Sequence, residues 1–190
     1  SATLIRAMDT PTKITEAIKT SNQLTLEAWI TPDHIKQRGV APIVTLSNGA
    51  YERNLTLAQK RKKYLARLRT TQTTDNGTHP SLKSGKGKIK TQLTHVVYTR
   101  DAQERAHFYI DGQRVKSRTI RGYTQNWDDN AQFGLANEFG ATRDWLGQYH
   151  LVALYDRALN ADEALQNYRA GILPACNKLP LAAFDTDKTA

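Results

Sequence analysis

Hydrophobic and polar residues alternate over much of the chain, which is typical of strands that are buried on one face. Segments with this alternation, or with many β-branched and aromatic residues, lie at 24–30, 41–47, 53–59, 63–70, 93–100, 106–112, 113–120, 131–138 and 148–156. Turn-forming residues separate them, and Asp111-Gly112 predicts a tight hairpin. Short strands at this spacing predict an all-β sandwich or barrel.

Helical signals are few. One helix is predicted over 161–170, where Asn160 is a good N-cap, Glu163 can complete a capping box and Gly171 can end the helix. The EAIK stretch at 16–19 predicts no more than one helical turn.

The length of 190 residues suits one domain, which we place at 1–172, with 173–190 as a C-terminal tail or linker. The chain does not begin with Met, so we expect a domain excised from a longer protein. No apolar run approaches the roughly 18 residues of a membrane span, so membrane insertion is not expected.

Charge narrows the possible partners. The formal net charge is +9, which favours an anionic polysaccharide, nucleic acid or an anionic membrane surface, although solubility alone also explains it. Nothing besides charge points to nucleic acid, so we do not expect that partner. The single cysteine, Cys176, excludes an intrachain disulfide.

Several segments occur in an order that suggests a family: LTLEAWI (24–30), LTHVVYTRD (93–101), FYIDGQRV (108–115) and WLGQYHLVALYDRAL (145–159). Over about 14–171 the chain resembles a laminin-G-like domain of the concanavalin A-like lectin/glucanase superfamily. The resemblance implies a two-sheet antiparallel jelly roll, here with one short C-terminal helix. It further implies binding of carbohydrate or protein, frequent calcium binding, and a secreted or cell-surface bacterial protein.

Enzymes of the same superfamily have features that are missing here. Glucanases carry paired acids on one strand, and no strand of this chain places two carboxylates on one face. Lyase relatives use arginines with a Gln/His pair and a Tyr. Gln148, His150 and Tyr155 resemble this set only loosely. We therefore predict a non-catalytic module, with a polysaccharide lyase as a weaker alternative.

Basic residues supply the first candidate ligand contacts. Alternation places Arg67 and Arg69 on one face of the strand at 63–70, where two guanidinium groups can bind carboxylates or sulfates; the alternative is a solvated outer face. The lysines of the glycine-containing loop 83–90 are interpreted as a soluble hairpin tip.

Aromatic residues are the second set. Trp145 follows a polar loop and precedes Gly147, so it is a candidate platform for a sugar ring, together with Tyr149 and Trp127. The alternative is that Trp145 covers one end of the sandwich. The family resemblance implies that the strand at 148–156 lies centrally in its sheet, which would explain why it is apolar on both faces.

Two polar clusters complete the candidates. Arg53 and Asn54 begin one strand, and Asn137 and Glu138 end another, so an Arg–Glu pair can join the strand ends or line a sugar site. Asp128 and Asp129 are candidate calcium ligands, with turn-stabilising hydrogen bonds as the alternative.

The favoured function is thus a carbohydrate-binding module with a preference for anionic glycans. The alternative is a protein-interaction, adhesion or spacer module.

Overall fold

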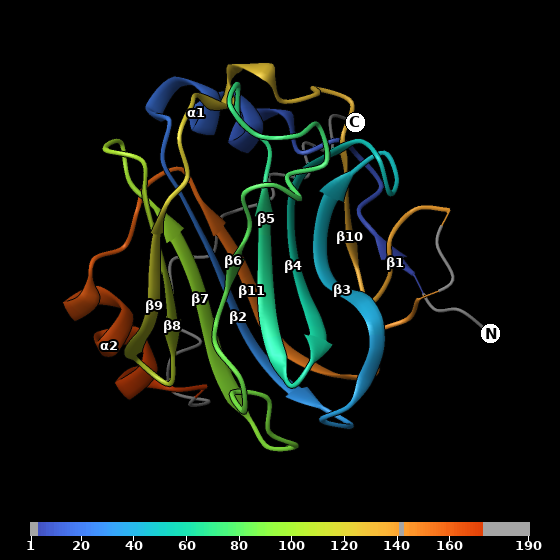
Figure 1. Cartoon of the computed structure of the whole chain (residues 1–190), viewed down its shortest axis with the longest axis vertical. Coiled ribbons are helices and arrows are strands. Elements are labelled where there is room, and N and C mark those ends of the chain that lie inside the picture. The colour runs from blue at the N-terminus through green and yellow to red at the C-terminus, as the bar shows by residue number, and fades with distance from the viewer. Residues whose placement is uncertain (1–3, 141–142, 173–190) are drawn as a thin grey trace, which may run out of the picture.

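The computed structural model describes residues 4–140 and 143–172, which form two antiparallel sheets packed face to face (Figure 1). One sheet has six strands, in the order β1 (Ile5–Arg6), β10 (Gln132–Leu135), β3 (Gln37–Ser47), β4 (Arg53–Arg61), β5 (Lys63–Leu68) and β6 (Leu82–Lys83). The other has five, in the order β11 (Gly147–Tyr155), β2 (Leu24–Pro32), β7 (Thr94–Arg100), β8 (Arg105–Ile110) and β9 (Gln113–Thr119). The predicted jelly-roll sandwich is confirmed; the predicted tail at 173–190 lies outside the described residues.

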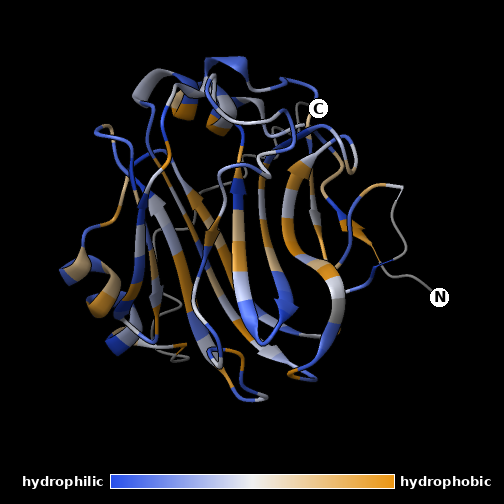
Figure 2. Cartoon of the chain, viewed as in Figure 1, coloured by the Kyte–Doolittle hydropathy of each residue, from blue (hydrophilic) through white to orange (hydrophobic). Residues whose placement is uncertain are grey.

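The core lies between the two sheets. Figure 2 shows hydrophobic and hydrophilic residues following one another along several of the strands. Leu26 and Ile30 of β2, Leu57 of β4 and Phe108 of β8 are at most 1% exposed. Burying one such side chain contributes about 1.5–3 kcal/mol. The period-two pattern seen in the sequence is therefore the pattern of core-facing residues.

Helix α2 (Ala161–Ala170) covers part of the outer face of the five-stranded sheet, where Ala164 packs with Val97 and Tyr109. Its predicted capping box is confirmed: Asn160 accepts a hydrogen bond from the Glu163 backbone, and Glu163 accepts one from the Asn160 backbone. This helix explains why β2 is buried on both faces.

A second helix corrects the prediction of a single one. Helix α1 spans Thr12–Ser21, where only one turn was expected. Its N-terminus has no side-chain cap, and Ile18 is one of few apolar residues that anchor it, so the sequence signal is weak. The helix is held at its C-terminus instead, where Arg100 donates to the Asn22 carbonyl at 2.8 Å and Thr124 of the 3-10 helix Thr124–Asn126 donates to the Ile18 carbonyl at 3.0 Å.

The position of β11 was also predicted wrongly. It is an edge strand, and among the described residues it pairs with β2 alone. Val152 and Leu154 pack against the core, whereas Tyr155 projects to the other side and donates a hydrogen bond to Glu27 beneath α2. Packing on both sides, rather than a central position, accounts for its two apolar faces.

In contrast, the outer face of the six-stranded sheet faces the viewer in Figure 1 with no helix in front of β3, β4 and β5. This open face is where the candidate site lies. Within the described part of the chain, neither helix has the length and apolar character needed to cross a membrane.

Candidate functional site

The floor of the site is formed by side chains of β4 and β5 that point away from the core. The register pairs Thr56 with Arg67 and Ala58 with Leu65. Although these positions face outward, Thr56, Ala58 and Leu65 are at most 2% exposed. They are recessed because longer side chains and loops rise around them, so this face is a groove rather than a flat surface.

Three hollows make up the groove, and they are joined by shared residues. The tyrosine end, of about 310 Å³, is lined by Tyr51, Arg53, Thr56, Arg67, Glu138 and Arg143 among others. The middle hollow, of about 590 Å³, shares Arg67 with it. The lysine end, of about 930 Å³, shares Lys60 and Lys83 with the middle hollow. The three hollows therefore adjoin one another along β4 and β5, and together they are called the groove.

The predicted Arg–Glu pair is present at the tyrosine end. Both nitrogens Nε and Nη2 of Arg53 donate to the Glu138 carboxylate, the second at 2.7 Å, and both residues are at most 7% exposed. Asn137 supports the pair by accepting a hydrogen bond from the Glu138 backbone at 2.8 Å. Asn54 instead exchanges two hydrogen bonds with the Asp128 backbone. The cluster thus joins strand ends, and it also lines the groove through Arg53 and Glu138.

Arg67 lies where the tyrosine end meets the middle hollow. Among the described residues no carboxylate forms an ion pair with it, and its buried Nε has no hydrogen-bond partner. Burial lowers the pKa of Arg67, and the nearby charge of Arg53 lowers it further. Both effects disfavour the positive charge, so a bound anion at this place would be stabilising.

Arg69 and Arg67 line different hollows. Arg69 follows the last residue of β5 and lines a hollow with Glu52, Asp75 and Asp128 that shares Tyr51 with the tyrosine end. Its Nη2 lies 3.7 Å from the Asp75 carboxylate. The backbone pairing continues to Arg69, whose N–H donates to the Asn54 carbonyl at 2.9 Å, and joint action of the two arginines on one ligand stays a prediction.

The proposed sugar platform at Trp145 is not available either. Trp145 is only 2% exposed, its indole N–H donates to Gln59 Oε1 at 2.9 Å, and its ring meets that of Tyr149 edge to face. Tyr149 in turn donates its hydroxyl to the Ile43 carbonyl at 2.6 Å. Gly147 allows this packing, because a Cβ there would lie 2.3 Å from the Trp145 ring. The alternative interpretation, in which Trp145 closes the sandwich, is the one that the structure bears out.

Trp127 is buried as well, at 3% exposure, with its indole N–H bonded to the Arg69 carbonyl at 2.8 Å. The exposed aromatic residue of the groove is Tyr51, which is 82% exposed in the loop between β3 and β4. Tyr51 was not among the ligand-binding residues predicted from the sequence. The available signal was an aromatic residue in a turn-rich loop, a place where binding residues are common.

The candidate calcium ligands are engaged in other contacts. Asp128 accepts hydrogen bonds from the Asn48 side chain at 2.6 Å and the Asn130 backbone at 2.8 Å, and Asp129 forms an ion pair with Lys19. Residues 4–140 and 143–172 contain no group of three or more His, Cys, Asp and Glu side chains placed to hold a metal ion. The turn-stabilising interpretation of this stretch fits these contacts.

The residues of the weaker lyase alternative do not come together. Arg67 belongs to the six-stranded sheet, whereas Gln148, His150 and Tyr155 belong to β11 in the five-stranded sheet. The hydroxyl of Tyr155 is bonded to Glu27 at 2.9 Å.

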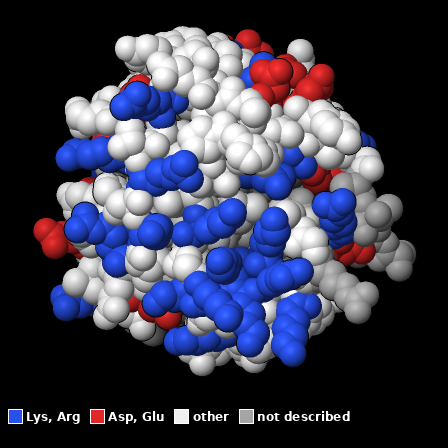
Figure 3. All heavy atoms as spheres, viewed as in Figure 1, with Lys and Arg blue, Asp and Glu red and all other residues white. Residues whose placement is uncertain are grey.

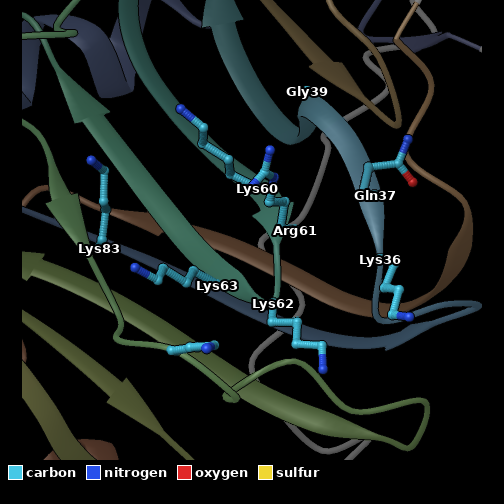
Figure 4. A pocket seen from close by; sticks show the side chains of 9 residues that line it. Lys36, Gln37, Gly39, Lys60, Arg61, Lys62, Lys63 and Lys83 are labelled. Carbon is cyan, nitrogen blue, oxygen red and sulfur yellow. The ribbon is translucent and has the colours of Figure 1, made fainter.

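The lysine end is a concentration of positive charge. Figure 3 shows Lys and Arg gathered over the lower part of the viewed face, and Figure 4 shows their side chains around the hollow. Seven basic residues line it: Lys36, Lys60, Arg61, Lys62, Lys63, Lys83 and Lys86. Residues 60–63 form four consecutive cations, a signal in the sequence that the strand assignment obscured. The loop interpreted as a soluble tip contributes Lys83 and Lys86.

The fold and this groove can now be set beside known proteins. Residues 7–164 match the model of the Concanavalin A-like lectin/glucanases superfamily (Laminin_G_3), so the chain belongs to that family. No curated protein sequence matched the chain.

Among solved structures, the chain is similar to the CBM40 of Ruminococcus gnavus IT-sialidase, with a TM-score of 0.62 and 11% identity over 87% of this chain and 98% of that one. It is also similar to a putative carbohydrate binding protein from Bacteroides ovatus, with a TM-score of 0.58 and 17% identity over 78% of this chain and 41% of that one. A third match is the binding domain of botulinum neurotoxin DC in complex with rat synaptotagmin II. Its TM-score is 0.60, with 7% identity over 82% of this chain and 37% of that one. At these identities the likeness is one of fold.

Proposed function

We propose that this chain is a non-catalytic carbohydrate-binding module that takes an acidic glycan in the groove of the six-stranded sheet. The observation that carries the proposal is Arg67, which forms no ion pair within the described residues and lies where two hollows of the groove meet. A guanidinium group can bind a carboxylate or sulfate through two parallel hydrogen bonds. The glycan's acidic group would take this place.

Tyr51 and the floor supply the apolar part of the contact. A sugar ring presents C–H groups on its faces, and these pack favourably on an exposed aromatic ring. Thr56 lines the same hollow as Tyr51, and its small side chain forms part of the floor there. The Arg53–Glu138 pair is internally neutralised, so it shapes the wall without competing for the anion.

The comparisons support this proposal at the level of the fold. One structure of the Ruminococcus gnavus CBM40 is bound to α2,3-sialyllactose, which carries an acidic sugar, and the fold of the present chain is similar to it. Acidic polysaccharides are abundant outside cells, and together with the family this supports a secreted or surface-attached location for the protein.

A second candidate, binding of a protein, is favoured by one observation: the similar neurotoxin domain is seen in complex with synaptotagmin. The two candidates differ in where the ligand contacts the chain. A glycan should depend on Arg67, which lines two of the hollows, whereas a protein partner of flat surface should depend on exposed residues around them.

Isothermal titration calorimetry with sialyllactose, oligogalacturonate and a heparin disaccharide, each against neutral lactose, tests the proposal. We expect an acidic ligand to bind and Arg67→Ala to weaken it roughly 10- to 100-fold, the equivalent of about 1.5–3 kcal/mol for a charged hydrogen-bonded contact. Arg114→Ala is the matched control, because Arg114 is exposed on β9 and lines none of the three hollows. Absence of binding to all acidic ligands, or equal losses in the two variants, would overturn the proposal.

A further inference from the structure

We infer that the groove binds an internal stretch of a linear polyanionic polysaccharide, one with sulfate or carboxylate groups along its whole length. The inference rests on the proposed function and assigns a second contact region to it. Arg67 holds one acidic group, and the lysine end holds the charges that follow along the same chain.

The length of the groove is the first argument. It follows β4 from Arg53 at the tyrosine end to Lys60 at the lysine end, and at about 3.3 Å per residue this distance is roughly 23 Å. That is longer than any one sugar ring. The lysine end includes the turn between β4 and β5, which lies where these two strands end, so a polysaccharide chain can continue past it.

The kind of charge is the second argument. The seven basic side chains of the lysine end form no ion pair with any carboxylate of the described residues, and no acidic residue lines this hollow. Six of the seven are lysines, which act as mobile point charges rather than as fixed forks. Such a set tolerates different positions of successive anionic groups, which suits a repeating polymer better than a single defined anion.

The spacing of the cations agrees with this. Lys63 and Arg67 lie four residues apart on the outward face of β5, or about 13 Å. Lys83 of β6 is paired with Leu65, midway between them. Cations thus recur along the groove from the lysine end to Arg67, with no unpaired carboxylate between them among the lining residues.

The surroundings favour a polysaccharide over other polyanions. Grooves for single-stranded nucleic acid present several aromatic platforms in succession, whereas among the described residues Tyr51 and His79 are the exposed aromatic side chains lining these hollows, and they line different ones. A membrane surface is too flat to reach the recessed floor. None of the large apolar side chains exposed in the described residues lines the lysine end, so an anchor for lipid is missing there.

Size-defined heparin oligosaccharides, from disaccharide to decasaccharide, test the inference when titrated at several NaCl concentrations. We expect affinity to rise with length until the ligand spans the groove. The salt dependence should steepen in parallel, because each anionic group that contacts a lysine releases a counterion. Oligogalacturonates of matched length identify the anionic group: tighter binding of the heparin series assigns sulfate, and tighter binding of the galacturonate series assigns carboxylate.

The decisive variant is the triple substitution Lys36→Ala, Lys62→Ala and Lys86→Ala, because these three lysines line the lysine end and neither of the other two hollows. It should weaken decasaccharide binding at least 10-fold and flatten its salt dependence, while disaccharide binding at Arg67 stays within about twofold. The control carries Lys13→Ala, Arg114→Ala and Arg169→Ala, which remove the same net charge from exposed positions outside the groove. This control should bind both ligands as the parent chain does.

The possible failures are distinguishable. If the disaccharide binds through Arg67 but longer chains bind no more tightly, the inference is wrong and the proposed function stands. Equal losses in the two triple variants would show a response to net charge alone and overturn the inference. A single-stranded oligonucleotide that binds as tightly as a decasaccharide of equal charge would also overturn the inference. If no acidic saccharide binds at any length, the proposed function fails as well.

Discussion

Replacement of Glu27 by Gln should destabilise the protein in a way that depends on pH. Glu27 is 3% exposed in the layer between the five-stranded sheet and α2. Its carboxylate accepts hydrogen bonds from His95 at 2.7 Å, Tyr155 at 2.9 Å and Asn167 at 3.0 Å. One carboxylate therefore links β2 to β7, β11 and α2.

The balance of effects on Glu27 sets the sign of the pH dependence. Burial acts to raise its pKa, but the hydrogen bond and charge of His95, with the bonds from Tyr155 and Asn167, outweigh burial and hold the pKa below its ordinary value of 4.5. A carboxyl group whose pKa is lowered on folding stabilises the fold above its unfolded pKa. This contribution is lost as the pH falls from about 4.5 through the lowered pKa of the folded state.

The size of the effect follows from the contacts. The Glu27 carboxylate is the acceptor of three hydrogen bonds in a buried place, and a hydrogen bond to a charged group contributes about 1.5–3 kcal/mol. Gln retains one acceptor, so we expect a loss of about 3 kcal/mol at pH 7. For a chain of this length that corresponds to a fall in Tm of roughly 6–12 °C.

The loss of stability can be measured by thermal and urea unfolding of the parent chain and of Glu27→Gln, each at pH 7 and at pH 3. The gap between the two proteins should narrow at pH 3. Glu16→Gln is the control, because Glu16 is exposed on α1, and it should change Tm little at either pH. A Glu27→Gln protein as stable as the parent at pH 7, or a gap of the same size at both pH values, would refute the reasoning.

Two further substitutions test other parts of the core. Trp145→Ala should lower the free energy of unfolding by about 3–5 kcal/mol in urea titrations, because it leaves a cavity and removes the partner of Gln59, yet the folded fraction should bind acidic glycan with unchanged affinity. Loss of affinity in folded protein would restore the platform hypothesis. Arg100→Met should cost roughly 3 kcal/mol in the same assay, because the buried guanidinium donates to backbone carbonyls of Asn22 and Ile120, which would lose their partner. Unchanged unfolding would show that these bonds contribute nothing net.

The architecture could be predicted because it depends on local patterns. Alternation identifies core-facing positions without knowledge of the partner strand, and the hairpin at Asp111-Gly112 needs two residues with positive φ, found here at 51° and 73°. In contrast, the edge position of β11 and the full extent of α1 depend on what packs against them. The sequence pattern shows that a face is apolar, but not whether the other sheet or a helix covers it.

The site was harder to predict for the same reason. Trp145 follows a polar loop, which suggested exposure, but its ring turns inward to a partner 86 positions away in the sequence. The lysine end needs residues from 36, 60–63 and 83–86 in one place, and only the pairing of β4, β5 and β6 brings them together. Arg67 was found from alternation alone, because a basic residue on an otherwise regular strand marks the outward face.

The most direct test of the account locates the ligand on the chain. An ¹H–¹⁵N NMR titration with an acidic oligosaccharide should shift the backbone amides of Thr56, Ala58, Leu65 and Arg67, and these shifts should disappear in Arg67→Ala while the rest of the spectrum stays folded. Shifts confined to other regions, such as α2 and the five-stranded sheet, would contradict a binding groove on β4 and β5.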